Sequence, residues 1–191
     1  TVPIYFSATV DRKPTKCVAF NDNTLSATPN KATGVGAGLY LQFTTDEGEA
    51  VTAKVGISYT SVENARLNLQ SEAENITFDE AKQRSHDIWQ EMLSRIEAET
   101  ENREDKVKFY SGLYHALLGR GVCSDVNGAY PRNDGSVGQI PEKDGKPAFN
   151  VYNTDAMWGG QWNLTQLWLM AYPEHISDFI SSHLQVYKDC G

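Results

Sequence analysis

Hydrophobic and polar positions follow two different periods along the chain. In the first part, apolar residues alternate with polar or small ones, as they do in half-buried strands. The segments with this pattern are 4–10, 16–21, 38–43 and 50–59. Further along, apolar residues recur every three or four positions, which is the helical period. The change falls within residues 55–69, so this stretch is expected to join a strand module to a helical module.

The strand region indicates part of an antiparallel β-sandwich. Short strands separated by polar turns are typical of that fold, but four strands are too few to close a two-sheet core. Residues 44–49 contain Asp-Glu-Gly and are expected to form a hairpin connection. Gly34, Gly36 and Gly38 suggest a phosphate-binding loop, but such a loop needs a helix directly after the glycines. A strand follows here, so a flexible strand entry is the favoured interpretation.

Capping signals mark the starts of the helices. Thr60 with Glu63, and Thr77 with Glu80, have the spacing of a capping box. Apolar periodicity predicts a short helix after residue 60 and longer ones at about 78–96, 104–118, 155–172 and 173–190. Pro173 suits a first helical position, and the last two helices are expected to form an antiparallel hairpin. Trp162 and Trp168 are expected in the core between helices.

A long connection, residues 120–153, precedes this last hairpin. It is longer than the connections of most compact domains, which suggests a functional role. Asp144-Gly145 is expected to form a small hairpin within it. Asp125 and Asn127 could bind a cation, but their spacing differs from that of a calcium-binding loop, so an Asx-turn is favoured.

Composition narrows the classes of function. The net charge is −8, and residues 71–191 carry nineteen acidic and eleven basic residues. This acidic excess argues against nucleic acid or an anionic membrane as a partner, and no apolar run is long enough to span a bilayer. The first residues lack the pattern of a signal peptide and are interpreted as a cut end. The three cysteines are expected to be isolated buried thiols, which leaves the compartment open.

Several motifs occur in a fixed order along the chain. They are Val-Gly-Ile-Ser-Tyr-Thr-Ser-Val-Glu-Asn-Ala-Arg-Leu-Asn-Leu at 55–69, Trp89 with Leu93, Phe-Tyr-Ser-Gly-Leu-Tyr-His at 109–115, and Ser-Asp-Val-Asn-Gly-Ala-Tyr at 124–130. Together they resemble the family-92 glycoside hydrolases, the calcium-dependent exo-α-mannosidases. The resemblance covers nearly the whole chain.

The resemblance implies an α+β multidomain fold. Residues 1–59 would be the end of an N-terminal antiparallel β-sandwich, 60–102 a helical linker, and 103–191 the first hairpins of an (α/α)6 barrel. In the family the active site lies between the sandwich and the barrel. This part of the fold should then expose large apolar surfaces, which are expected to bind the missing remainder of the same polypeptide or a second copy of the chain.

The resemblance also implies an activity. The family hydrolyses α-linked mannose from the chain end with inversion, and α-1,2 linkages are expected here. Inversion requires an acid and a base about 6.5–9.5 Å apart. In the family both groups, and the calcium ligands, come from later in the barrel. No catalytic acid, base or metal ligand is therefore assigned in this chain, and the isolated chain is expected to be inactive.

Family membership further implies a mannose-containing glycan as partner and a periplasmic or extracellular location. The alternative is a non-catalytic carbohydrate-binding or structural relative.

The sugar-binding residues are predicted around a departure from the family pattern. An early barrel helix of the family opens with Trp-Asp-Thr, and this chain has Trp158 followed by Gly159. The indole suits the apolar face of a sugar, but the carboxylate that would accept hydroxyl hydrogen bonds is missing. Asp155, one helical turn earlier, could supply it; alternatively the helix starts after residue 160 and Asp155 caps a preceding turn. Tyr130 and Tyr152 border the long connection and either line the cleft or lie buried beneath it.

Overall fold

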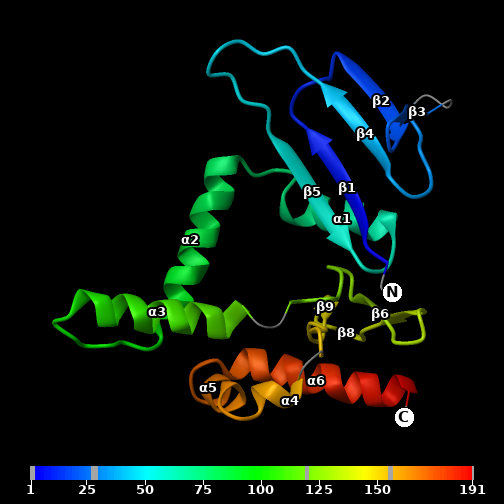
Figure 1. Ribbon diagram of the computed structural model, residues 1–191. Helices are drawn as coiled ribbons and strands as arrows, with labels where there is room; N and C mark the ends of the chain where they lie inside the picture. Colours follow the sequence, from blue (N-terminus) through cyan, green and yellow to red (C-terminus); the bar gives the residue numbers. More distant parts are fainter. Residues whose placement is uncertain (1–2, 27–29, 119–120, 155–156, 191) are drawn as a thin grey trace. The chain divides into compact units, whose positions relative to one another are not determined.

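The computed structural model describes residues 3–26, 30–118, 121–154 and 157–190 (Figure 1). Its described part has a mixed α+β fold with small antiparallel sheets and six helices. By its internal contacts the chain divides into two compact units. The smaller unit is 8–54, and the larger unit combines 1–7 with 55–191.

The smaller unit is built on a three-stranded antiparallel sheet. Its strands are β2 (Lys16–Asn21), β3 (Thr24–Leu25) and β4 (Ala37–Gln42), in the order β3-β2-β4. Gly38 on β4 lies opposite Phe20 on β2, and a Cβ on Gly38 would lie 2.5 Å from Cζ of that ring. The glycine run therefore leads into a strand, as favoured from the sequence, and one of its glycines leaves room for an aromatic ring.

The remaining two long strands pair with each other. β1 (Tyr5–Val10) and β5 (Ala53–Ser58) form a two-stranded sheet, whereas β4 pairs with β2. The prediction that residues 44–49 connect two paired strands is therefore wrong. Alternation identifies a strand, but it carries no information about which strand lies beside it. The segment instead turns at Gly48, with φ of 81°, and the Glu49 carboxylate binds the Arg12 guanidinium.

Six helices lie in the described part of the larger unit. They are α1 (Val62–Glu72), α2 (Phe78–Ser94), α3 (Arg103–Leu118), α4 (Met157–Gly160), α5 (Leu164–Ala171) and α6 (Pro173–Cys190). The capping box at the start of α2 is confirmed, because the Glu80 N–H donates to the Thr77 hydroxyl and the Thr77 N–H donates to the Glu80 carboxylate.

The other capping box, predicted for Thr60 and Glu63, is wrong. Ser61 is the N-cap of α1, and its hydroxyl accepts the Asn64 N–H at 3.0 Å. Either hydroxyl could cap the helix by local chemistry. The hydroxyl of Thr60 is instead hydrogen-bonded to the carboxylate of Asp125, far away in sequence.

The helix predicted for residues 155–172 is two helices, α4 and α5, separated by a turn at 161–163. Two adjacent glycines with low helix propensity end α4, and Asn163 occupies the N-cap position of α5. The start of α6 at Pro173 is confirmed. α5 and α6 pack together, as the sequence predicted (Figure 1).

The helices enclose an apolar core. Its buried members are Leu113 on α3, Trp168 on α5, Tyr172 after α5, and Ile176 on α6. The Tyr172 hydroxyl donates to the Met92 carbonyl on α2 at 2.9 Å, so a polar bond joins a fourth helix to this core. The predicted burial of Trp168 is confirmed, but Trp162 is 74% exposed. Because Trp162 lies in the turn before α5, it does not share the buried face of that helix.

The long connection before the last hairpin is itself folded. It contains β6 (Ala129–Pro131), β7 (Val137–Gln139), β8 (Glu142–Lys143) and β9 (Lys146–Pro147). Tyr130, Ile140 and Val151 form a small core between its turns. The predicted hairpin at Asp144-Gly145 is confirmed: both residues have positive φ, as a primed two-residue turn requires.

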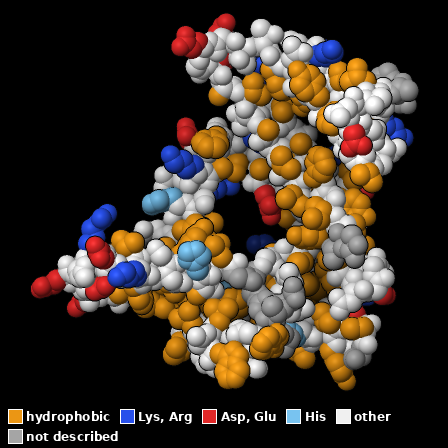
Figure 2. All heavy atoms as spheres, viewed as in Figure 1, with side chains coloured by type: hydrophobic (Ala, Val, Ile, Leu, Met, Phe, Trp, Pro, Cys, Tyr) orange, Lys and Arg blue, Asp and Glu red, His pale blue; other side chains and the backbone are white. Residues whose placement is uncertain are grey.

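Apolar side chains remain on the surface of the last helices. Trp158, Leu169 and Met170 are exposed on α4 and α5, and hydrophobic side chains gather over this region at the bottom of Figure 2. Among the residues that the structure describes, no helix combines the length and hydropathy needed to cross a membrane.

Candidate functional site

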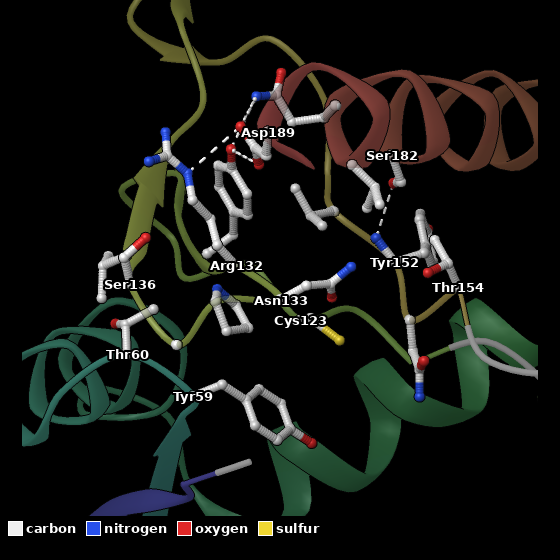
Figure 3. Close-up of a pocket in the computed structure, with 18 of the residues that line it drawn as sticks. Tyr59, Thr60, Cys123, Arg132, Asn133, Ser136, Tyr152, Thr154, Ser182 and Asp189 are labelled. Atoms are coloured by element: carbon white, nitrogen blue, oxygen red, sulfur yellow. Dashed lines mark hydrogen bonds and ion pairs between the residues drawn. The ribbon is translucent and has the colours of Figure 1, made fainter. Parts of the chain in front are cut away.

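A cavity of about 480 Å³ in the larger unit brings Tyr130 and Tyr152 together. Its size lies in the range of small-molecule binding sites. Distant segments of the chain contribute its walls: the first residues, the junction of β5 with α1, the β6–β7 hairpin, residues 151–154 and the last turns of α6. Figure 3 shows Asp189 and Ser182 on α6, Tyr152 and Thr154 on the segment 151–154, and Tyr59 directly after β5.

Tyr130 forms one wall of this cavity together with α6. Its hydroxyl donates to Asp189 Oδ2 at 2.7 Å and accepts from Gln185 Nε2 at 2.8 Å. Arg132 Nε lies 3.4 Å from Asp189 Oδ1 (Figure 3). Burial, and then the Asp189 carboxylate, raise the pKa of Tyr130, so the phenol stays protonated and acts as a donor. Tyr130 is thus both buried, at 2% exposure, and part of the cavity lining.

Gly138 makes room for this ring. It lies opposite Tyr130 on the neighbouring strand β7, and a Cβ there would lie 2.2 Å from Tyr130 Cζ. Any side chain at this position would displace the tyrosine. Gly138 therefore determines where the Tyr130 ring sits.

Tyr152 lines another part of the cavity. Its backbone N–H donates to the hydroxyl of the fully buried Ser182 on α6 at 2.9 Å. Its own hydroxyl lies 3.2 Å from His175 Nδ1. Burial, followed by the carboxylates of Asp178 and Glu174, raises the pKa of Tyr152. The same tyrosine also borders a second cavity of about 370 Å³, whose lining includes Trp89, Trp168 and His175.

The other two predicted residues are not brought into this cavity. Trp158 on α4 is 71% exposed and lines neither of the two cavities. Asp155 lies outside the described residues, so its role stays a prediction. A Cβ added to Gly159 would meet no atom within 4 Å, and the space beside this glycine is open among the described residues.

Sequence reasoning missed Arg132, Gly138, Gln185 and Asp189. The spacing of Gln185 and Asp189, four residues apart on one helix, indicates that the two side chains can meet. Nothing local indicates that both would meet Tyr130. That contact arises only when α6 packs beside the β6–β7 hairpin.

Asp125 lies near the cavity but does not line it. Its carboxylate accepts side-chain hydrogen bonds from Ser58, Thr60 and Asn68. The Asx-turn in this loop belongs to Asn127, whose Oδ1 accepts the Ala129 N–H at 3.1 Å. In the part of the chain that the structure describes, no three His, Cys, Asp or Glu side chains are grouped to hold a metal ion.

Comparisons with known proteins identify relatives of this fold. Over 97% of its length the chain matches the structure of the family GH92 alpha-mannosidase BT3965 from Bacteroides thetaiotaomicron, with a TM-score of 0.82 and 24% identity, and it covers 25% of that chain. Over 97% it also matches the family GH92 inverting mannosidase BT2199 from Bacteroides thetaiotaomicron VPI-5482, with a TM-score of 0.75 and 22% identity, and again covers 25% of that chain. The chain thus spans about a quarter of the length of these structures. Among curated proteins, none matches it.

The sequence comparison reaches the same family independently. The pattern of the glycosyl hydrolase family 92 catalytic domain matches residues 64–191, which include Tyr130, Tyr152 and α6. This match extends over well more than half of the chain, and the resemblance noted from its motifs is confirmed. The chain belongs to glycosyl hydrolase family 92.

Proposed function

We propose that the full polypeptide carrying this chain is an α-mannosidase that removes α-linked mannose from the ends of glycans with inversion. Its cavity lined by Tyr130 and Tyr152 would help to bind the sugar. The observation that carries this proposal is family membership over residues 64–191, the same segment that supplies most of the cavity. Two solved relatives are named as mannosidases, and one of them is named as inverting.

The cavity has chemistry suited to a sugar. Tyrosine rings offer apolar surface to C–H groups, while Asn133, Gln185 and Asp189 offer amide and carboxylate groups to hydroxyls. Arg132 adds guanidinium N–H donors on the same side. This chain's part in the reaction is binding and orientation; the acid and the base would come from elsewhere in the polypeptide.

Further features of the family follow as parts of the same proposal. Residues 1–59 would end a β-sandwich, 60–102 would be a linker, and 103–191 would begin an (α/α)6 barrel. Calcium would be held by residues outside this chain, and the enzyme would work in the periplasm or outside the cell. An α-1,2 linkage is the expected substrate.

Mannose release tests the activity. The full polypeptide should liberate mannose from α-1,2-mannobiose, and chelation of calcium should abolish this release. The isolated chain, residues 1–191, should release none. Absence of hydrolysis with every α-linked mannobiose would contradict the proposal.

Substitution of a tyrosine tests the cavity. Tyr130→Phe removes the hydroxyl between Gln185 and Asp189, and we expect the KM for the mannoside to rise about fivefold. Tyr187→Phe is the matched control, because Tyr187 is 71% exposed on the same helix that carries Asp189. Equal KM values for the two variants would contradict the proposal that this cavity helps to bind the sugar.

A second function is a carbohydrate-binding relative without catalysis. Gly159 favours it, because the family's aspartate is absent at this position and the space beside the glycine is open. Such a protein would bind mannose in calorimetric titration but would release none from mannobiose.

A further inference from the structure

Two motifs that lie far apart in the sequence meet in one buried hydrogen-bond network. Ser58, Thr60 and Asn68 belong to residues 55–69, and Asp125 belongs to residues 124–130. Each of the four side chains is buried, with exposures between 2% and 8%. We refer to these four residues as the Asp125 network.

The carboxylate of Asp125 is the centre of this network. Its Oδ2 accepts the Ser58 hydroxyl at 3.0 Å and the Thr60 hydroxyl, and its Oδ1 accepts Asn68 Nδ2 at 2.7 Å. The amide of Asn68 continues the contact, because its Oδ1 accepts the Val126 N–H at 3.0 Å. Among the described residues Asp125 has no ion pair, so neutral donors alone satisfy the carboxylate. These donors share one acceptor, and removing it takes a hydrogen bond from each of three buried side chains.

The loop that carries Asp125 continues into cavity-lining residues on both sides. The Asp125 N–H donates to the Ala129 carbonyl at 2.8 Å, and the Gly128 N–H donates to the Asp125 carbonyl at 2.8 Å. These two bonds close the loop into a rigid turn. Tyr130 follows directly, and Cys123 lies two residues before Asp125; both line the cavity.

The junction of β5 with α1, which supplies the donors of the network, lines a different part of the cavity. Thr60 itself lines the cavity, beside Tyr59. Gly56, on the strand before it, packs directly on α1: a Cβ there would lie 2.2 Å from the Ala65 carbonyl oxygen. The strand end is therefore held firmly on the helix, and Asp125 ties the loop to this fixed junction.

We propose that Asp125 is a positioning residue for sugar binding, which holds the wall of Cys123 and Tyr130 at a set distance from the wall of Tyr59 and Thr60. Its contribution to sugar binding rests on the proposed function, whereas its effect on the loop does not. A direct catalytic or metal-binding role does not fit. Asp125 is 5% exposed, it does not line the cavity, and its oxygens are already engaged by side chains.

The position of the loop is measured on Cys123 in the full polypeptide. Burial raises the pKa of this thiol and slows its alkylation. The probe is iodoacetamide at pH 8, with the labelled cysteine identified by mass spectrometry. Asp125→Asn offers one carbonyl oxygen where the carboxylate has two, so at least one buried donor loses its acceptor. We expect the alkylation rate of Cys123 to rise about fivefold.

Sugar binding is measured in the same variants. We expect Asp125→Asn to raise the KM for α-1,2-mannobiose about fivefold with kcat within about twofold, because binding and not the chemical step is disturbed. The matched control is Asp144→Asn, the same chemical change in the exposed turn between β8 and β9, and it should behave as wild type.

A second pair of variants covers the case in which Asp125→Asn does not fold. Thr60→Val keeps the shape of the side chain and removes the hydroxyl, whereas Thr60→Ser keeps the hydroxyl. Faster labelling of Cys123 in Thr60→Val but not in Thr60→Ser supports the proposal.

Unchanged labelling in folded Asp125→Asn, or a fall in kcat at constant KM, overturns it. If labelling changes while the wild-type protein hydrolyses no mannoside, the positioning of the loop stands and the proposed function fails.

Discussion

Two buried regions of the larger unit are stabilised by different interactions, one by apolar packing and the other by hydrogen bonds. The helical core of Leu113, Trp168, Tyr172 and Ile176 is apolar and depends on the volume its side chains fill. The Asp125 network is polar and depends on each donor meeting its acceptor. A core of the first kind tolerates similar shapes, whereas a network of the second kind tolerates only matching hydrogen-bonding groups.

The difference explains what each region contributes. The helical core joins α2, α3, α5 and α6 through broad contact, which gives stability without specifying one precise geometry. The Asp125 network joins one loop to the junction of β5 with α1 at defined atoms, which specifies geometry beside a cavity. Four substitutions separate these contributions, beginning with the largest expected effect.

Trp168→Ala should destabilise the larger unit by about 4 kcal/mol. It removes the largest buried side chain of the helical core and leaves a cavity. Trp162→Ala is the control, since that residue is 74% exposed and its loss should change stability by less than about 0.5 kcal/mol. Urea denaturation of the full polypeptide measures both. Equal shifts in the two variants would mean that Trp168 does not belong to the core.

Asp125→Ala should destabilise by about 3 kcal/mol, because three donors lose one shared acceptor. Asn127→Ala, an exposed amide in the same loop, should cost under about 1 kcal/mol. The same denaturation experiment compares them. If Asp125→Ala were as mild as Asn127→Ala, the network would not differ from surface hydrogen bonds.

Tyr172→Phe tests a polar bond inside the apolar core and should cost about 1 kcal/mol. The ring stays in place, and only the hydroxyl that donates to the Met92 carbonyl is lost. A loss as large as that of Asp125→Ala would show that the helical core, too, depends on exact polar pairing. Tyr187→Phe, at an exposed position of α6, serves as the reference.

The smallest effect is expected from the ion pair at the edge of the helical core. Arg95, after α2, binds Glu174 at the start of α6. Burial would raise the pKa of Glu174, but its own backbone N–H and the Arg95 guanidinium outweigh burial and lower it from 4.5. Because the pKa is lower in the folded state, this stabilisation is present above about pH 4.5 and is lost as the pH falls through the folded pKa.

Glu174→Gln should therefore reduce stability at pH 7 by under about 1 kcal/mol, the usual value for exposed ion pairs. The difference from wild type should shrink as the pH falls below 4.5. Denaturation at pH 7, 5 and 3 measures it. A difference that grows toward acid would contradict the assignment of the pKa shift.

Two tyrosines of the cavity lining were within reach of sequence reasoning, and the residues that it missed meet them only across long distances in the chain. Tyr130 and Tyr152 were found because they border an unusually long connection, and both line the cavity. Asp189 and Gln185 were missed, because their partner Tyr130 lies more than fifty residues away. Trp158 was chosen from a family motif alone, and its place in a sugar site stays a prediction.

The sequence by itself determined the local elements and the family. The local elements depend on residues close together in the sequence: the strand 16–21, the strand predicted at 38–43 and found at 37–42, the capping box of Thr77, the primed turn at Asp144-Gly145 and the start of α6 at Pro173. Only the tertiary structure decided which strands pair, which hydroxyl caps α1, and what Asp125 binds. By local chemistry the Thr60 hydroxyl could cap α1. It binds the Asp125 carboxylate instead, because a hydrogen bond to a buried carboxylate is stronger than one to the N–H groups at a helix end.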